Sequence, residues 1–197
     1  MTEKPTKHIV IINGSGGVGK DAFCRACTRY ADCSVRSSIE PIKDIARQIG
    51  WEGGKSDRDR KFLADLKALS AAYNDYPMQW MRGAVNAFNG YGDDDDILFL
   101  HIREPKEIER AAKEFDAVTV LVTNHRIPKI TTNKSDASVD DYWYDAVIHN
   151  DGDLTDLDRM ACQFVEWLRA GCPFRPAILH PGKHALVARG EQPPHLA

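Results

Sequence analysis

The chain has 197 residues, of which 43% are hydrophobic and 28% are charged, and its formal net charge is −3 at pH 7. This composition is typical of one folded domain with a sizeable core and excludes wholesale disorder. The charge balance excludes a global basic field that would hold a nucleic-acid backbone, whereas a few local arginines would suffice to bind a small anion.

No targeting or membrane segment is visible in the sequence. The longest apolar runs are short, such as 9–12 and 97–100, whereas a membrane-spanning helix needs about 20 residues. The N-terminal residues lack the apolar core of a signal peptide. We therefore expect a cytoplasmic protein, monomeric or homodimeric, that binds neither nucleic acid nor a membrane. The five cysteines are expected to be free thiols.

Short apolar runs alternate along the chain with helical stripes of apolar residues. In chain order, the predicted elements are a strand at 8–12, a helix at 23–30, a strand at 33–38, helices at 41–49, 62–73 and 81–88, a strand at 97–102, a helix at 105–115, strands at 117–122 and 146–149, and a helix at 157–168. The stripe of the 62–73 helix includes Leu66, Leu69 and Tyr73. This alternation predicts a three-layer α/β fold, in which a five-stranded parallel sheet has helices on both faces.

Three regions outside this core pattern are predicted to have separate roles. The main domain would span 1–172, with a helical insert at about 50–92. The segment 123–142 is polar and too long for an ordinary connection, which predicts a functional loop or lid. Five of the ten prolines fall in 173–197, which predicts a loose tail whose removal leaves activity and stability nearly unchanged. The histidines of this tail are too sparsely flanked to predict a metal site; they are His180, His184 and His195.

A glycine-rich loop follows the first predicted strand and begins the first predicted helix. It consists of Gly14, Ser15, Gly16, Gly17, Val18, Gly19, Lys20 and Asp21. This spacing fits the phosphate loop G-x-x-x-x-G-K, in which backbone N–H groups cradle an anion at a helix N-terminus and Lys20 reaches the β- and γ-phosphates of ATP. Asp21 stands where Ser or Thr usually binds Mg²⁺, and a carboxylate is also a suitable oxygen ligand for that ion.

The same stretch also fits the dinucleotide fingerprint G-x-G-x-x-G. Gly14, Gly16 and Gly19 occupy the glycine positions, and Glu40 lies about 20 residues on, where such folds bind the ribose. Lys20 favours the phosphate loop, because a lysine directly after the last glycine has no role in the dinucleotide fingerprint. A purely structural glycine turn is the remaining alternative.

These residues resemble the P-loop nucleoside monophosphate kinase superfamily, and most closely the bacteriophage-type deoxynucleoside monophosphate kinases. The resemblance covers roughly 8–168 and rests on the Gly-Lys-Asp ending of the loop together with four supporting stretches, at 38–46, 57–63, 101–105 and 144–152. It implies a P-loop fold that uses ATP and Mg²⁺ to phosphorylate a small nucleotide.

A phosphoryl transferase must neutralise the charge of two sets of phosphates. Arg103 follows the third predicted strand, at the end where ligands bind in such sheets, so it is a candidate to hold the acceptor phosphate. The alternative is a surface ion pair with Glu104 or Glu107. Arg126 lies in the predicted lid and is a candidate for the transferring phosphate, with a solvated loop charge as the alternative.

Further candidates lie around the predicted insert. The acceptor would contact Arg36, Glu40, Lys43 and Arg60, together with Arg103. The alternative for Arg60 is a solvated helix face, and for Glu40 a carboxylate at a helix N-terminus. Cys24 and Cys27 have the spacing of a redox pair, but Cys27 lies on the apolar stripe and a core position is the favoured interpretation.

The sequence therefore predicts ATP-dependent phosphoryl transfer to a (deoxy)nucleoside monophosphate, giving ADP and the diphosphate. Lys20, Arg103 and Arg126 are the predicted catalytic residues, and Asp21 the predicted Mg²⁺ ligand. One alternative is a kinase of another small phosphorylated metabolite on the same fold, with a coenzyme precursor or a phosphomevalonate-like acceptor. The other is a nucleotide-binding protein without turnover.

Overall fold

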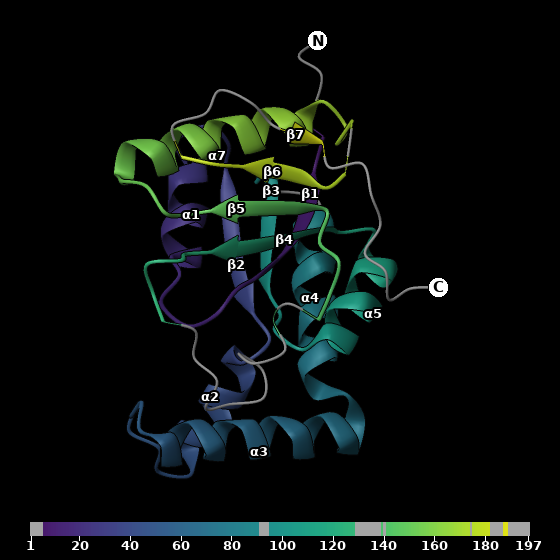
Figure 1. The fold of residues 1–197 in the computed structure, drawn as a ribbon. Coiled ribbons are helices and arrows are strands. Elements are labelled where there is room, and N and C mark those ends of the chain that lie inside the picture. Colours follow the sequence, from purple (N-terminus) through teal and green to yellow (C-terminus); the bar gives the residue numbers. More distant parts are fainter. Residues whose placement is uncertain are drawn as a thin grey trace.

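The computed structural model describes residues 6–90, 95–128, 139, 141–173, 175–181 and 187–188, and these form one twisted sheet with helices around it (Figure 1). The strand order is β2-β3-β1-β4-β5-β6-β7. The strands are β1 (His8–Asn13), β2 (Cys33–Ser37), β3 (Ile97–His101), β4 (Val118–Thr123), β5 (Ala146–His149), β6 (Ala177–Leu179) and β7 (Val187–Ala188). β1 to β6 are all parallel, and only β7 pairs antiparallel, with β6.

Helices cover both faces of the sheet, as the alternating pattern predicts. The helices are α1 (Lys20–Cys27), α2 (Glu40–Gln48), α3 (Asp57–Asn74), α4 (Tyr76–Asn89), α5 (Pro105–Phe115) and α7 (Leu154–Arg169). Figure 1 shows α1 and α7 on one side of the sheet, and α4 and α5 on the other. None of the helices within the described ranges has the length and apolar character to cross a bilayer.

Successive side chains of β1 point to opposite faces of the sheet, and each face has its own core cluster. Val10 and Ile12 belong to the cluster beneath α1 and α7, whereas Ile11 between them belongs to the cluster beneath α4 and α5. A strand buried on both faces has to be apolar at every position, which is why β1 reads as a continuous apolar run. Cys24 and Cys27 are free thiols in the first cluster, which confirms the core interpretation.

The sheet is larger than the five strands expected from the sequence. The segment Ala177–Leu179 forms β6 beside β5, with Ala146 opposite Ala177 and Ile148 opposite Leu179. Ala177 and Leu179 are fully buried. The prediction of a loose tail from Pro173 is therefore wrong for this stretch, because its apolar residues complete the sheet; most of 182–197 lies outside the described residues.

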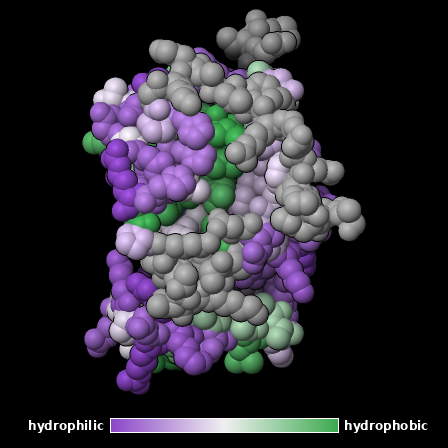
Figure 2. Space-filling model, viewed as in Figure 1, coloured by the Kyte–Doolittle hydropathy of each residue, from purple (hydrophilic) through white to green (hydrophobic). Residues whose placement is uncertain are grey.

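Helix α3 projects beyond the sheet and lies across one end of the molecule (Figure 1). A capping box starts it, in which Ser56 and Asp59 each accept a hydrogen bond from the other's backbone N–H. The apolar stripe predicted for this helix is only partly buried, because Leu69 and Tyr73 are exposed, and Figure 2 shows hydrophobic surface over this helix. Helix α4, within the predicted insert, packs into the second core cluster.

Candidate functional site

All six parallel strands end at one edge of the sheet, where ligands bind in folds of this kind. The phosphate loop follows β1 at this edge, Arg103 follows β3, and Arg126 follows β4. The sheet order places β1 between β3 and β4. The predicted catalytic residues Lys20, Arg103 and Arg126 therefore come from three adjacent strands.

Two glycines of the loop sit where no other residue fits. Gly14 has a φ of 147°, and a Cβ on it would lie 2.4 Å from the carbonyl oxygen of Val122 in β4. Gly19 has a φ of 99°, and a Cβ there would lie 2.3 Å from Nδ2 of Asn150, just after β5. Turn backbone of this kind directs N–H groups inward, toward an anion. The close contacts fix the loop against β4 and the residue after β5.

Lys20 is the first residue of α1 and is only 9% exposed. Its Nζ donates hydrogen bonds to the carbonyl oxygens of Gly14 at 2.5 Å and Ser15 at 3.0 Å. The ammonium is therefore held over the glycine loop. Gly19 caps α1 without a side-chain hydrogen bond, which leaves the helix N-terminus able to bind an anion.

Asn13 connects the loop to its surroundings and was not singled out from the sequence. It is fully buried, and its Oδ1 accepts a hydrogen bond from the Gly14 N–H at 2.8 Å. Its Nδ2 donates to the carbonyl of Arg103 at 3.1 Å and to the hydroxyl of Tyr144 at 2.7 Å. Tyr144 in turn donates to the carbonyl of Val139. This network ties the phosphate loop to the backbone at Arg103 and to the end of the predicted lid.

Asn150 holds the loop from the other side. Its Nδ2 donates to the carbonyl of Val18 at 2.9 Å, and its backbone N–H donates to the carbonyl of Thr123 at 2.8 Å. In the sequence, both asparagines are polar residues that directly follow a predicted buried strand, and this pattern could have marked them as site residues. The pattern does not show that they converge on one loop, because that depends on the strand order.

Asp21 lies in the first turn of α1, and its carboxylate is exposed. Beside it lies His101, whose Nδ1 is 3.7 Å from Oδ1 of Asp21. Burial lowers the pKa of His101 to about 4; the Asp21 carboxylate acts in the opposite direction, and the positive charges of Lys20 and Arg103 add to the lowering. His101 is therefore neutral at pH 7, and Asp21 presents an oxygen ligand toward solvent.

The buried His101 predicts a loss of stability in acid. Between pH 6.5 and 4 the unfolded chain takes up a proton at this residue and the folded chain does not, so folding becomes less favourable as pH falls. The full shift corresponds to roughly 3 kcal/mol. The free energy of unfolding of wild type and of His101→Gln, measured with urea, is plotted against pH. The two plots should converge as the pH falls through this window. Parallel curves would show that His101 does not cause the acid sensitivity.

The two glutamates considered as ion-pair partners of Arg103 are both bound by Lys67. Nζ of Lys67 on α3 donates to Glu104 at 2.6 Å and to Glu107 at 2.7 Å. Burial would raise the pKa of Glu104, but the Lys67 ammonium and hydrogen bonds hold it below the usual range. Burial raises the pKa of Glu107, and the adjacent Glu104 adds to the effect. This partly buried cluster attaches the projecting helix to the start of α5, directly beside Arg103.

The predicted lid falls largely on residues outside the described ranges. Of 123–142, the structure describes 123–128, 139, 141 and 142. Arg126 is exposed there, and its backbone N–H donates to Oδ1 of Asn124 at 3.0 Å. Ile127 approaches the phosphate loop, since a Cβ on Gly17 would lie 4.0 Å from its Cδ1. The start of the segment thus lies against the loop.

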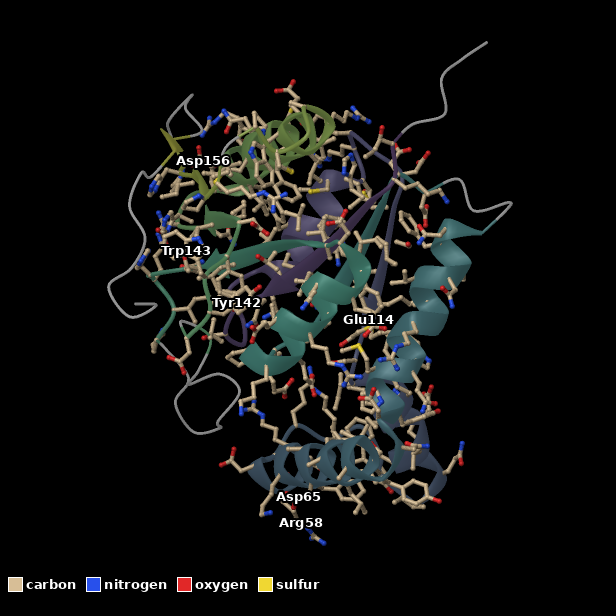
Figure 3. The ribbon with its side chains drawn as sticks, turned by 90° about the vertical axis from the view of Figure 1, so that its right-hand side faces the viewer. Arg58, Asp65, Glu114, Tyr142, Trp143 and Asp156 are labelled. Atoms are coloured by element: carbon tan, nitrogen blue, oxygen red, sulfur yellow. The ribbon has the colours of Figure 1, made fainter. Side chains whose placement is uncertain are left out.

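The predicted acceptor residues are spread over two neighbouring regions. Glu40 and Lys43 lie in the first turns of α2, after β2, and Arg36 lies within β2 with its guanidinium donating to the adjacent Val35 carbonyl. Arg60 is exposed on α3, seven residues before Lys67, which is two helical turns along the same face. Figure 3 shows Arg58 and Asp65, by contrast, pointing away from the body of the molecule.

The strand order argues against the dinucleotide alternative. In that fold the strand carrying the ribose-binding acid lies next to the strand before the glycine loop, in the order 3-2-1-4-5-6. Here β3 lies between β1 and β2. Glu40, after β2, is therefore two strand spacings, about 10 Å, from β1, whereas the fingerprint requires one spacing.

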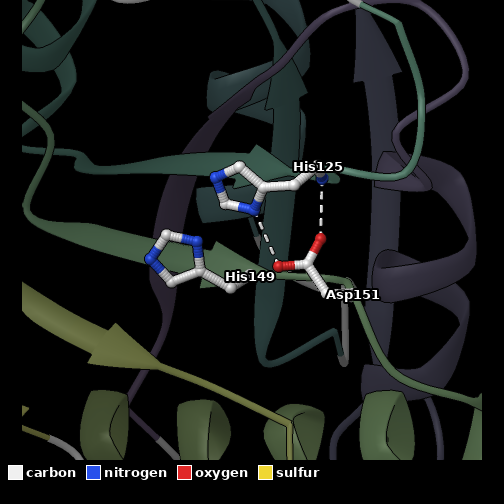
Figure 4. Close-up of side chains that lie close together, drawn as sticks. All are labelled: His125, His149 and Asp151. Atoms are coloured by element: carbon white, nitrogen blue, oxygen red, sulfur yellow. Dashed lines mark hydrogen bonds and ion pairs between the residues drawn. The ribbon is translucent and has the colours of Figure 1, made fainter.

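Two histidines and an aspartate lie together at the ends of β4 and β5 (Figure 4). The backbone N–H of His125 donates to Oδ1 of Asp151 at 2.6 Å, and its Nδ1 is 2.7 Å from Oδ2. Nδ1 of His149 is 2.9 Å from the Thr123 hydroxyl. The ring of His180, just after β6, stacks on His149 with centroids 4.2 Å apart. Burial would raise the pKa of Asp151, but the bonds from His125 outweigh it, so Asp151 is ionised at neutral pH.

Comparison with known proteins leaves the chain without a family assignment. No protein-family model matches it, and no curated protein matches its sequence. A solved structure of a "putative kinase" from Chloroflexus aurantiacus J-10-fl is similar over part of the fold, with a TM-score of 0.38 and 12% identity. The match covers 61% of each chain. A likeness of this degree assigns no activity, so the functional argument rests on the loop and its surroundings.

Proposed function

We propose that the protein transfers the γ-phosphoryl group of ATP to a small phosphorylated acceptor, with a (deoxy)nucleoside monophosphate as the favoured class. The observation that carries the proposal is the loop from Gly14 to Lys20. Three of its four glycines have positive φ, it joins a buried parallel strand to a helix N-terminus, and its lysine is held over the loop carbonyls. Backbone N–H groups, a helix dipole and an ammonium in this arrangement bind the phosphates of a nucleotide.

The residues present fit ATP and Mg²⁺ on the donor side. The concave loop and Lys20 would hold the β- and γ-phosphates, and ATP would supply the transferable group. Asp21 would hold Mg²⁺, because its exposed carboxylate is one residue from Lys20 and offers the oxygen ligands that this ion prefers. His101 beside it is neutral and adds no competing positive charge.

The acceptor would lie between the phosphate loop and the projecting α3. Arg103 would hold the acceptor phosphate, since Asn13 bonds both the backbone of Arg103 and the loop, and so fixes the distance between the two phosphate sites. Arg126 would screen the transferring group from the β4 side. Positioned positive charges act where negative charge develops during transfer, which is the main source of catalysis in this reaction class.

A second candidate is a nucleotide-binding protein without turnover. The ion pairs of Lys67 with Glu104 and Glu107 favour the kinase, because they attach a separate helix beside Arg103. A protein that only binds nucleotide needs no such additional helix. A kinase of another phosphorylated metabolite would share the whole donor side.

The proposal is tested with an acceptor panel. The full chain is incubated with Mg²⁺ and ATP and, in turn, each deoxynucleoside and nucleoside monophosphate, phosphomevalonate and a phosphorylated coenzyme precursor, and ADP is measured. We expect ADP to form at a rate that depends on one class of acceptor. ADP formation that no acceptor stimulates would contradict the proposal and favour simple hydrolysis.

Arg103→Lys separates acceptor binding from ATP binding. A lysine cannot copy the bidentate contact of a guanidinium with a phosphate, so we expect a higher acceptor KM, a lower kcat, or both. ATP affinity without acceptor, and slow hydrolysis of ATP by water, should hardly change. Arg25→Lys, an exposed position in the last turn of α1, is the matched control. Equal losses in ATP binding and turnover would place Arg103 on the donor side instead.

A further inference from the structure

We propose that His125, His149 and Asp151 form a binding site for a divalent transition-metal ion of the zinc class. This ion would be separate from the magnesium that accompanies ATP. The proposal rests on the geometry of the three side chains alone and does not depend on the proposed kinase activity.

The backbone brings the three residues together. One potential ligand atom from each lies within 4.8 Å of the other two. His149 is the last residue of β5, and Thr123 opposite it is the last residue of β4, so His125 and Asp151 each lie two residues beyond a paired strand end. Hydrogen bonds from the backbone N–H groups of Asn150 and His125 hold the two strand extensions side by side. The cluster therefore belongs to the rigid edge of the sheet.

The donor set selects the class of metal. Two imidazoles and one carboxylate are ligands typical of Zn²⁺, Co²⁺, Ni²⁺ and Fe²⁺, whereas Mg²⁺ and Ca²⁺ prefer oxygen ligands throughout. Three protein ligands leave one position of a tetrahedral ion for water, as in zinc sites that exchange ligands.

Side-chain movement is needed to admit the ion, because the three ligand atoms lie within 4.8 Å of one another but not at the spacing of a bound ion. Zinc bonds of about 2.0–2.2 Å in a tetrahedral site place neighbouring ligand atoms about 3.3 Å apart, whereas Nδ1 of His125 and Oδ2 of Asp151 are 2.7 Å apart in a hydrogen bond. The His125 side chain is 70% exposed and has room to shift by the difference. The ion would replace the proton that the two atoms now share.

Neighbouring groups orient the ligands. The Thr123 hydroxyl contacts His149, and the His180 ring stacks on it at an angle of 10°. Such outer partners fix the orientation of ligating histidines. Asn150, between two of the ligands, bonds the phosphate loop at Val18. A bound ion would thus also fix the segment that supports the phosphate loop, and we expect it to raise the melting temperature.

The test is a titration of the tag-free, metal-stripped full chain with Zn²⁺ in competition with a chromophoric chelator. We expect one equivalent to bind, and His125→Ala and Asp151→Asn each to weaken binding at least about tenfold, which is the loss that removal of an outer partner alone brings. Glu109→Gln is the control, because it neutralises an exposed carboxylate on α5 outside the cluster, and it should leave the affinity unchanged.

Thermal melts and Co²⁺ absorption spectra test the same site independently of the titration. Because His125 is exposed, His125→Ala should fold normally, and Zn²⁺ should raise the melting temperature of wild type but not of this variant. Co²⁺ as a probe should give visible absorption bands of tetrahedral coordination in wild type only. Failure of wild type to bind Zn²⁺, or binding that His125→Ala and Asp151→Asn retain, would overturn the proposal.

Discussion

Lys20→Ala is expected to lower the rate of phosphoryl transfer about 100-fold or more, because it removes a charge that stabilises the transferring phosphates in a site shielded from water. The fold should survive the change. The polar contacts of Lys20 are hydrogen bonds to two loop carbonyls. The measurement is steady-state kinetics with the best acceptor, together with ATP titration and a thermal melt.

Lys113→Ala is the matched control for this prediction. Lys113 lies exposed in the last turn of α5, away from the edge that carries the phosphate loop. The rate of phosphoryl transfer and the melting temperature of Lys113→Ala should equal those of wild type. A folded Lys20→Ala protein with near-wild-type activity would contradict the assignment of the loop.

Deletion of 173–197 is expected to destabilise the protein severely. The deletion removes β6, whose Ala177 and Leu179 are fully buried, and the ion pair between Arg175 and Asp145. Loss of one buried leucine side chain alone costs about 2–5 kcal/mol, so the melting temperature should fall by roughly 10 °C or more. Thermal melts followed by circular dichroism measure the effect.

A shorter deletion identifies the cause. Removal of 182–197 retains β6 and should lower the melting temperature much less than removal of 173–197. Leu179→Ala in the full chain should reproduce a large part of the loss. Equal stability of the full chain and the chain ending at Cys172 would show that β6 contributes little.

The local parts of the fold could be predicted from the sequence. The β1 strand, the glycine loop and α1 are consecutive, and each is specified by a short pattern: a β-branched run, fixed glycine spacing and an apolar stripe. The parallel sheet with helices on both faces followed from the alternation of these patterns. Such features depend on neighbours in the sequence and need no knowledge of distant contacts.

The features that the sequence did not predict depend on contacts between distant segments. β6 is a three-residue strand among prolines, and only its pairing with β5 identifies it as part of the sheet. The α3 stripe was assigned by hydrophobicity, yet Leu69 is exposed while Lys67 is buried by its two glutamates. The convergence of Asn13 and Asn150 on one loop depends on strand order, which a single sequence does not reveal.

The most direct test of the account is a ³¹P NMR time course of the wild-type chain with ATP, Mg²⁺ and the acceptor that best stimulates ADP formation. The account predicts that the γ-phosphate signal of ATP disappears while ADP and the phosphorylated acceptor appear in equal amounts, with little inorganic phosphate. It predicts no such conversion by Lys20→Ala. Inorganic phosphate as the main product, or unchanged ATP in the presence of folded wild-type protein, would contradict the proposal that the chain is a phosphotransferase.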